Sequence, residues 1–153
     1  MSRFFYRKII AFLIILLLWF LSSAFFPFDI GYYLTLKVPS FFPNNYLISF
    51  IWIIIYIFNS SSTYILIKNY ELNNDYYFIL IINYLFNQTF SLFFSIFHSL
   101  FLTLIATTTT AITSIFLYLE AKKINKTSSY LLIPYLIWSL ISLILFIIIC
   151  TLN

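Results

Sequence analysis

Residues 130–152 read YLLIPYLIWSLISLILFIIICTL and contain no charged side chain. About 20 consecutive, mainly apolar residues are enough for a helix to cross the hydrocarbon core of a bilayer. No charged group would have to be buried in lipid, so the stretch predicts a transmembrane helix.

Four more apolar stretches precede this segment, separated by short polar connections. Including residues 130–152, the predicted spans are residues 9–27, 46–67, 76–97, 100–119 and 130–152. Residues 28–45 are predicted to form an aromatic loop that lies on the membrane face or folds over the bundle, and residues 120–129 a lysine-containing loop. The sequence therefore predicts an all-α, polytopic membrane protein, with residues 1–153 forming one domain of five transmembrane helices.

The composition supports this class and excludes others. Only 8% of the 153 residues are charged, against about 25% in soluble domains. The apolar runs are long and do not alternate as the strands of a membrane β-barrel do. The basic start and Ser22-Ser23-Ala24 also resemble a signal peptide, but the apolar stretch is long for one, so we expect a retained span. The single cysteine, Cys150, excludes an internal disulfide and a cysteine-based metal cluster.

The positive charges are distributed unevenly between the two predicted sides. Seven cations fall on the side of the N-terminus, and only Lys37 falls on the other. The seven are Arg3, Arg7, Lys8, Lys68, Lys122, Lys123 and Lys126. The positive-inside rule therefore places the N-terminus in the cytoplasm and the C-terminus outside. The cations are not gathered into one face, so no nucleic-acid partner is expected.

Aromatic and amide residues recur at helical spacing in three spans. The stripes are Trp52, Tyr56 and Asn59 in the second span, Asn83, Asn87, Phe90 and Phe94 in the third, and Pro134, Trp138, Ser142 and Leu145 in the fifth. Residues three and four apart share a helix face. The stripes could line a cavity for a flat, largely apolar ligand. They could equally serve interhelical packing, where a hydrogen bond is worth about 0.6 kcal/mol on average.

Other polar residues have simpler interpretations. Thr103, Thr107 and Ala111 are small and four apart, which favours close helix packing. His98 could be a haem ligand or proton relay, but it lies at a tight turn without a second histidine, so a surface role is expected. Glu120 is expected to be a solvated interfacial charge, and Trp19 to face lipid or the membrane interface.

No span core contains Asp, Glu, Lys or Arg, which disfavours proton-coupled transport. No hydrolase or metal motif is present, and no metal or cofactor is expected.

Three blocks of the sequence stand out by their motifs. Residues 36–43 (LKVPSFFP) are followed by Trp52 and Tyr56, residues 87–94 read NQTFSLFF, and residues 132–138 read LIPYLIW. In this order, the blocks resemble the first-loop, third-span and fifth-span motifs of the translocator protein, or tryptophan-rich sensory protein, family (TspO/MBR). The resemblance covers about residues 32–153.

The resemblance implies a five-helix bundle whose first loop caps a pocket that binds porphyrins, notably protoporphyrin IX. With Tyr56 from the stripes, the implied ligand-binding residues are Tyr32, Pro43, Trp52, Tyr56, Asn87, Phe90, Trp138 and Ser142. Some bacterial members are reported to degrade porphyrin in light, with the tryptophans matching Trp52 and Trp138 implicated. No catalytic residue is assigned here.

The chain departs from the family pattern at several positions. Asn44 replaces a proline, Phe90 a tryptophan, Leu92 a proline and Ala106 a common aspartate, and Phe146-Ile147 replaces an Asn-Tyr pair. Phenylalanine can still stack on a macrocycle, so the changes affect binding less than redox chemistry. No lysine or arginine follows Tyr135, so the family's sterol motif is not supported.

The preferred hypothesis is a porphyrin-binding receptor or sensor in a bacterial inner membrane. A light-dependent porphyrin-degrading enzyme and a structural or assembly subunit without a small ligand are the alternatives. A homodimer is plausible, although the single glycine provides no GxxxG motif.

Overall fold

A computed structural model describes residues 2–41, 43–70 and 72–153, without the side chains of residues 2–7, 45 and 69. Phe42, within the first family-like block, and Glu71 lie outside the described residues, as do the side chains of Arg3 and Arg7. Every regular element in the described part is helical, which confirms the all-α prediction.

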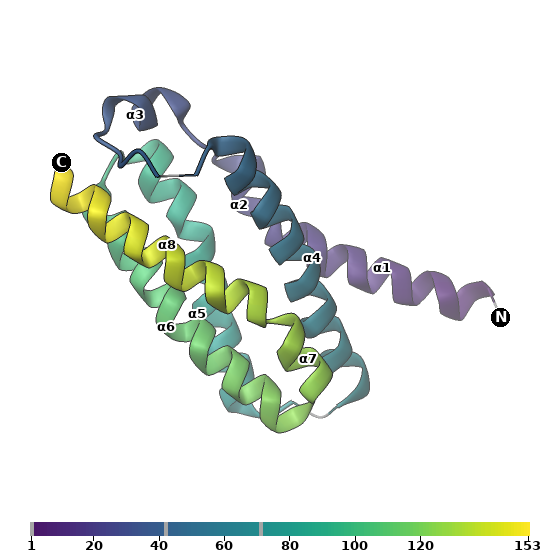
Figure 1. Ribbon diagram of the computed structural model, residues 1–153. Helices are drawn as coiled ribbons and strands as arrows, with labels where there is room; N and C mark the ends of the chain where they lie inside the picture. The colour runs from purple at the N-terminus through teal and green to yellow at the C-terminus, as the bar shows by residue number, and fades with distance from the viewer. Residues whose placement is uncertain (1, 42, 71) are drawn as a thin grey trace.

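The helices follow one another along the chain and pack into an elongated bundle (Figure 1). They are α1 (Ser2–Trp19), α2 (Leu21–Phe25), α3 (Ile30–Thr35), α4 (Asn45–Asn69), α5 (Asn74–Ser91), the π-helical segment η1 (Leu92–Ile96), α6 (Leu100–Ile124), α7 (Lys126–Leu131) and α8 (Ile133–Leu152).

Four helical segments are long and apolar enough to cross a membrane, so the protein is an integral membrane protein. They are Tyr46–Lys68, Asn74–Ile96, Leu100–Ile124 and Lys126–Leu152. The apolar part of α1, Lys8–Trp19, is shorter. At 1.5 Å per residue it extends about 18 Å, against a hydrocarbon core of about 30 Å. The expected first span, residues 9–27, is thus divided between α1 and α2.

Side chains of α5 satisfy the backbone where α1 ends and α2 begins. The Gln88 side chain accepts a hydrogen bond from the Ser22 N–H (2.7 Å) and donates one to the Trp19 carbonyl (3.3 Å). Tyr84 donates its hydroxyl hydrogen to the Leu18 carbonyl at 2.9 Å. Unpaired backbone groups are costly in lipid, so these bonds allow a break within an apolar segment.

Trp19 corrects a prediction made from the sequence. It was expected to face lipid or the interface, but it is only 3% exposed. Its ring stacks on Tyr56 at 5.9 Å between ring centres and meets Tyr84 and Tyr135 edge-on at 5.4 and 6.1 Å. Figure 1 shows α1 projecting away from the bundle toward the N-terminus. Of its described side chains, Trp19, Ile15 and Leu16 pack in the aromatic core.

Helix α6 packs against both α5 and α8. As predicted, its small residues lie in these contacts: Thr103, Thr107 and Ala111 are buried. The two threonine hydroxyls donate to carbonyls four residues earlier, Ser99 and Thr103. The helix therefore hides polar side chains without leaving these hydroxyls unpaired.

Two connections differ from the predicted loops. Residues 28–45 contain α3, which is capped by Asp29, whose carboxylate accepts a hydrogen bond from the Tyr32 N–H. The expected loop at residues 120–129 is mostly helical, because α6 continues to Ile124 and only Asn125 separates it from α7. The Asn125 side chain accepts from the Ser128 N–H and caps α7, so a single residue makes the turn.

The longer α6 also changes the environment of Glu120. Expected to be solvated, this residue is only 9% exposed and pairs with Lys123 one turn later. The neighbouring Leu117 and Ala121 are buried as well, so the helix carries Glu120 on its inward side.

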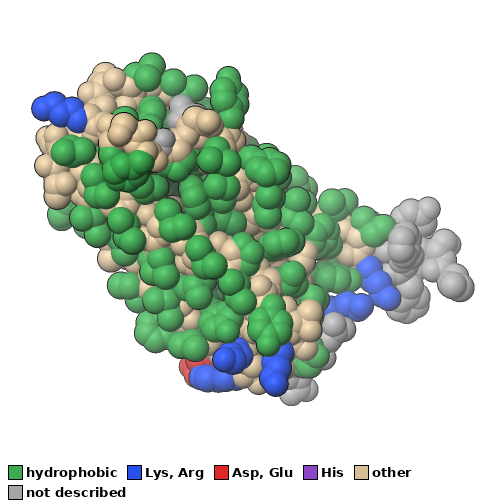
Figure 2. Space-filling model, in the orientation of Figure 1, with side chains coloured by type: hydrophobic (Ala, Val, Ile, Leu, Met, Phe, Trp, Pro, Cys, Tyr) green, Lys and Arg blue, Asp and Glu red, His purple; other side chains and the backbone are tan. Residues whose placement is uncertain are grey.

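Four described lysines lie at one end of the bundle, Lys37 lies at the other end, and Lys8 lies on the projecting α1. Lys68 lies in the last turn of α4, Lys122 and Lys123 in the last turn of α6, and Lys126 begins α7. Figure 2 shows basic side chains grouped at this end and an apolar surface over the long helices. Lys37 lies at the other end, where its backbone N–H and carbonyl pair with the Asn153 side chain.

Candidate functional site

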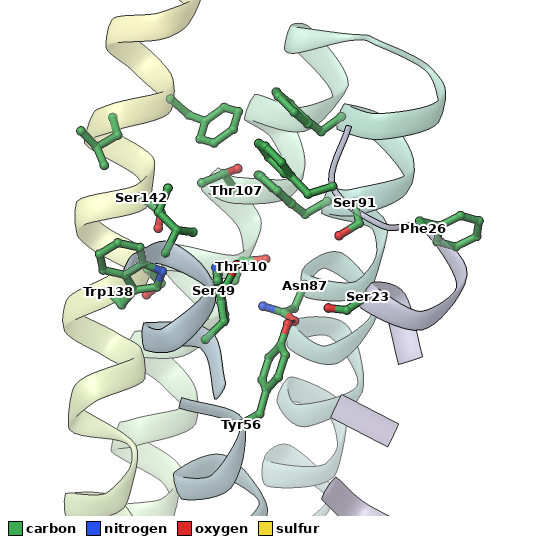
Figure 3. A pocket seen from close by; sticks show the side chains of 18 of the residues that line it. Ser23, Phe26, Ser49, Tyr56, Asn87, Ser91, Thr107, Thr110, Trp138 and Ser142 are labelled. Carbon is green, nitrogen blue, oxygen red and sulfur yellow. Dashed lines mark hydrogen bonds between the residues drawn. The ribbon is translucent and has the colours of Figure 1, made fainter. Parts of the chain in front are cut away.

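A cavity lies between the helices in the half of the bundle near α3 (Figure 3). Its volume of about 260 Å³ is just below the ~300–1,000 Å³ typical of ligand pockets. Side chains from α2, α3, α4, α5, η1, α6 and α8 contribute to its wall, together with residues between these helices. The cavity therefore depends on packing between segments far apart in sequence.

Six of the eight predicted ligand-binding residues line this cavity. They are Trp52 and Tyr56 from α4, Asn87 and Phe90 from α5, and Trp138 and Ser142 from α8. The structure thus brings the predicted residues of three helices together. Their role in binding a ligand stays a prediction.

Tyr32 and Pro43 are not among the lining residues. The Tyr32 ring stacks on the His98 imidazole at 4.3 Å, and its hydroxyl donates to the His98 carbonyl at 2.9 Å. Pro43 is half-buried. The loop reaches the cavity through Phe28 and Tyr33 instead.

The three stripes divide into two halves with different surroundings. Their members toward α3, including Asn87, line the cavity. Farther down, Asn83 donates to the Thr110 carbonyl and the Thr113 hydroxyl, and accepts from the Tyr135 hydroxyl at 2.8 Å. The stripes therefore line a cavity over one part of their length and serve interhelical packing over the other. Binding of a flat ligand in the cavity stays a prediction.

Aromatic rings form one wall of the cavity. Phe94 stacks on Phe28 with 4.9 Å between ring centres and an angle of 11°, and on Phe90 with 6.0 Å and 5°. Phe146 meets Phe90 and Phe94 edge-on at 84°. Phe94 belongs to the π-helical segment η1, a feature often found at functional sites. The result is a row of nearly parallel rings suited to a flat apolar ligand.

The inner end of the cavity carries neutral polar groups. The Tyr56 hydroxyl lies 3.5 Å from the Asn87 side-chain oxygen, a long hydrogen bond. Ser139 bonds the Ser114 hydroxyl at 2.8 Å. In Figure 3, Asn87, Tyr56 and Trp138 come from three helices toward this region. These groups can donate or accept hydrogen bonds without carrying charge.

A separate groove lies on the outer side of Trp138. It runs between α4 and α8 and is lined by Ile51, Ile54, Ile55, Ile133, Pro134, Ile137 and Trp138. Trp138 therefore contributes to both the internal cavity and this outer groove. Pro134, predicted as part of the inward stripe, belongs to the groove.

The loop above the cavity is tied to the turn before α6. Asp29 pairs with His98 at 2.9 Å between Oδ2 and Nε2, and the Asp29 N–H donates to the Ser95 hydroxyl at 3.1 Å. The Tyr32 N–H, and then His98, hold the pKa of Asp29 below its usual value. A carboxylate with a lowered pKa contributes stability above its unfolded pKa of about 3.9 and loses it as pH falls through the folded value. This attachment is therefore intact at neutral pH.

His98 accordingly has a surface role, as expected, with its side chain about half exposed. It adopts a positive φ of 48°, which allows the tight turn between η1 and α6.

Sequence reasoning missed the contributions of the first segment. Phe20, Ser23 and Phe26 line the cavity, together with Phe28 from the loop. The available signal was the pair Ser22-Ser23 inside an apolar stretch, followed by three phenylalanines within four residues. Hydropathy alone does not distinguish such a segment from an ordinary apolar span.

Comparison with known proteins identifies relatives of this chain. The profile of the TspO/MBR family matches residues 9–151. The chain is 34% identical to Tryptophan-rich protein TspO of Bacillus cereus over 133 residues, 86% of this chain and 87% of that protein. It is 35% identical to the uncharacterized membrane protein YtaB of Bacillus subtilis over 116 residues, 74% and 75% of the two chains. With this coverage, the chain belongs to the TspO/MBR family.

Proposed function

We propose that this protein is a membrane receptor or sensor that binds porphyrins in the cavity between α4, α5 and α8. The observation that supports this most is the convergence of six predicted residues on one cavity whose wall contains nearly parallel aromatic rings. A porphyrin is a flat π-system, and stacking on aromatic side chains is worth about 1–3 kcal/mol per base in nucleic-acid complexes. The same kind of contact would stabilise a macrocycle here.

The polar residues of the long helices also favour a ligand-binding protein over a proton-coupled pump. Inside the long helices the sequence places amides, hydroxyls and indoles, with no Asp or Lys at the span cores. Transport coupled to protons usually relies on such intramembrane ionisable groups. The neutral polar groups are suited to ligand recognition.

In this proposal α1 and α2 together form a fifth membrane-spanning segment, with the N-terminus in the cytoplasm. The seven-to-one cation bias supports this orientation. Both relatives named above come from bacteria, which supports placement in a bacterial plasma membrane. A homodimer stays a prediction, to be checked by the mass of the detergent-solubilised particle.

The function is tested by titrating purified protein in lipid nanodiscs with protoporphyrin IX and following tryptophan fluorescence. Trp52 and Trp138 line the cavity and Trp19 contacts Tyr56, so a ligand bound there should quench all three. We expect saturable quenching at one site per chain.

A cavity-filling variant locates the site. Ser142→Phe adds a ring inside the cavity and should abolish saturable quenching. Ile141→Phe, at the neighbouring and 40% exposed position on α8, is the matched control and should bind as the parent does. Undiminished quenching in Ser142→Phe would show that the porphyrin binds elsewhere.

A further inference from the structure

The lining of the cavity is apolar or neutral throughout. Among the described residues that form it, none is Asp, Glu, Lys, Arg or His. Its polar members are serines, threonines, tyrosines, tryptophans and Asn87. Some of these are already engaged, as in the Tyr56–Asn87 and Ser139–Ser114 pairs. The cavity therefore offers no cation to a negatively charged group.

This neutrality restricts which part of a ligand can be buried. Transferring an ionised carboxylate from water into an apolar environment without a partner is unfavourable by far more free energy than aromatic stacking contributes. Protoporphyrin IX carries two carboxylates, on propionate arms along one edge of the ring, while the opposite edge is hydrocarbon. Only the hydrocarbon edge matches the interior.

Charged groups lie instead around the outer end, near α3. Lys37 is the described lysine at this end, and its side chain is exposed. The Asn153 side chain bonds both the Lys37 carbonyl (3.0 Å) and the carbonyl of the cavity-lining Ile149 (2.8 Å). The backbone of Lys37 is thus held beside the C-terminal end of α8, one turn from the cavity-lining Ile149. Asp29 and His98 also lie at this end, and their side chains pair with each other.

We propose that the cavity takes a tetrapyrrole by its uncharged edge and leaves both carboxylates outside, on the side of Lys37. The inference rests on the proposed porphyrin-binding function and specifies its ligand class: the site recognises the hydrocarbon ring and does not require the acids. Neutral tetrapyrroles are therefore ligands as well.

The test compares protoporphyrin IX with its dimethyl ester. Both are titrated into the protein in nanodiscs, with binding to empty nanodiscs subtracted because the ester partitions more strongly into lipid. An exposed ion pair is worth at most about 1 kcal/mol, or about fivefold in affinity. We therefore expect the diester to bind at least as tightly as the diacid, or less tightly by under tenfold. A diacid preference of tenfold or more would overturn the inference while leaving the proposed function intact. Failure of both ligands to bind would refute the proposed function itself.

Lys37→Gln then tests where the carboxylates lie. We expect it to lower diacid affinity by up to about fivefold and leave the diester unchanged. An equal loss for both ligands, or no loss for either, would refute the assignment of the carboxylates to Lys37. Because Lys37 does not line the cavity, diester binding reports on the fold of the variant in the same experiment.

Discussion

Replacing Phe90 by alanine tests the aromatic wall most directly. Phe90 is the position where the chain departs from the family's tryptophan, and its ring is parallel to that of Phe94 within 5°. Loss of one stacking face is worth about 1–3 kcal/mol, or about 5- to 150-fold in affinity. Phe94 and Phe28 remain in the wall, which places the expected loss toward the lower end, at about tenfold.

The assay is the nanodisc titration with protoporphyrin IX, run on three variants. Phe90→Trp restores a larger ring at the same place and should hold affinity within about threefold of the parent. Phe78→Ala removes the same side chain from a 67% exposed position on the same helix and should leave affinity unchanged.

Thermal melting accompanies each titration, because Phe90→Ala also loses its contacts with Phe94 and Phe146. Each aromatic pair is worth about 0.5–1.5 kcal/mol. The reasoning is refuted if Phe90→Ala binds as the parent does, or if Phe78→Ala loses as much affinity as Phe90→Ala.

Three further predictions follow from features described above. Reporters placed after Asn153 and within residues 70–73 should lie on opposite sides of the membrane, external and cytoplasmic; the same side for both would rule out the proposed topology. Asn59→Leu should raise the melting temperature by a few degrees, because Asn59 is fully buried and neither polar atom of its side chain has a described hydrogen-bond partner; a lower melting temperature would show that the amide is needed. Under light, the parent should bleach bound protoporphyrin IX no faster than a Trp52→Phe, Trp138→Phe double variant at equal occupancy; bleaching several times faster would favour the enzyme hypothesis.

The long helices could be predicted from the sequence because hydropathy and length alone decide them in lipid. The four segments from residue 46 onward confirm this, and so does the turn at His98. The break between α1 and α2 could not be predicted, since it depends on Gln88, which lies 66 positions beyond Ser22. Hydropathy depends only on the local composition of a segment, so it carries no information on hydrogen bonds from another helix.

The cavity was partly predictable for a similar reason. Helical spacing shows which residues share a face, so Trp52 with Tyr56 could be grouped in advance. Spacing does not show at what depth neighbouring helices separate. Asn83 and Asn87 share a stripe, yet one is bonded into the packed half and the other lines the cavity. Trp19 was misplaced because its partners, Tyr56, Tyr84 and Tyr135, come from three other helices.

Trp138 lines both the cavity and the outer groove, so we expect bilayer lipid to compete for the proposed ligand site when this side chain is removed. The side chain would then no longer separate a ligand in the cavity from acyl chains that enter the isoleucine-lined groove. Truncating it to alanine would join the two spaces, so lipid tails could occupy the volume that a ligand needs. The affinity lost in Trp138→Ala should therefore grow with the content of flexible unsaturated chains in the nanodisc. Trp52 lines the cavity but not the groove, so the loss in Trp52→Ala should be independent of lipid. The side chain of Trp138 thus separates the proposed ligand site from the lipid that surrounds the protein.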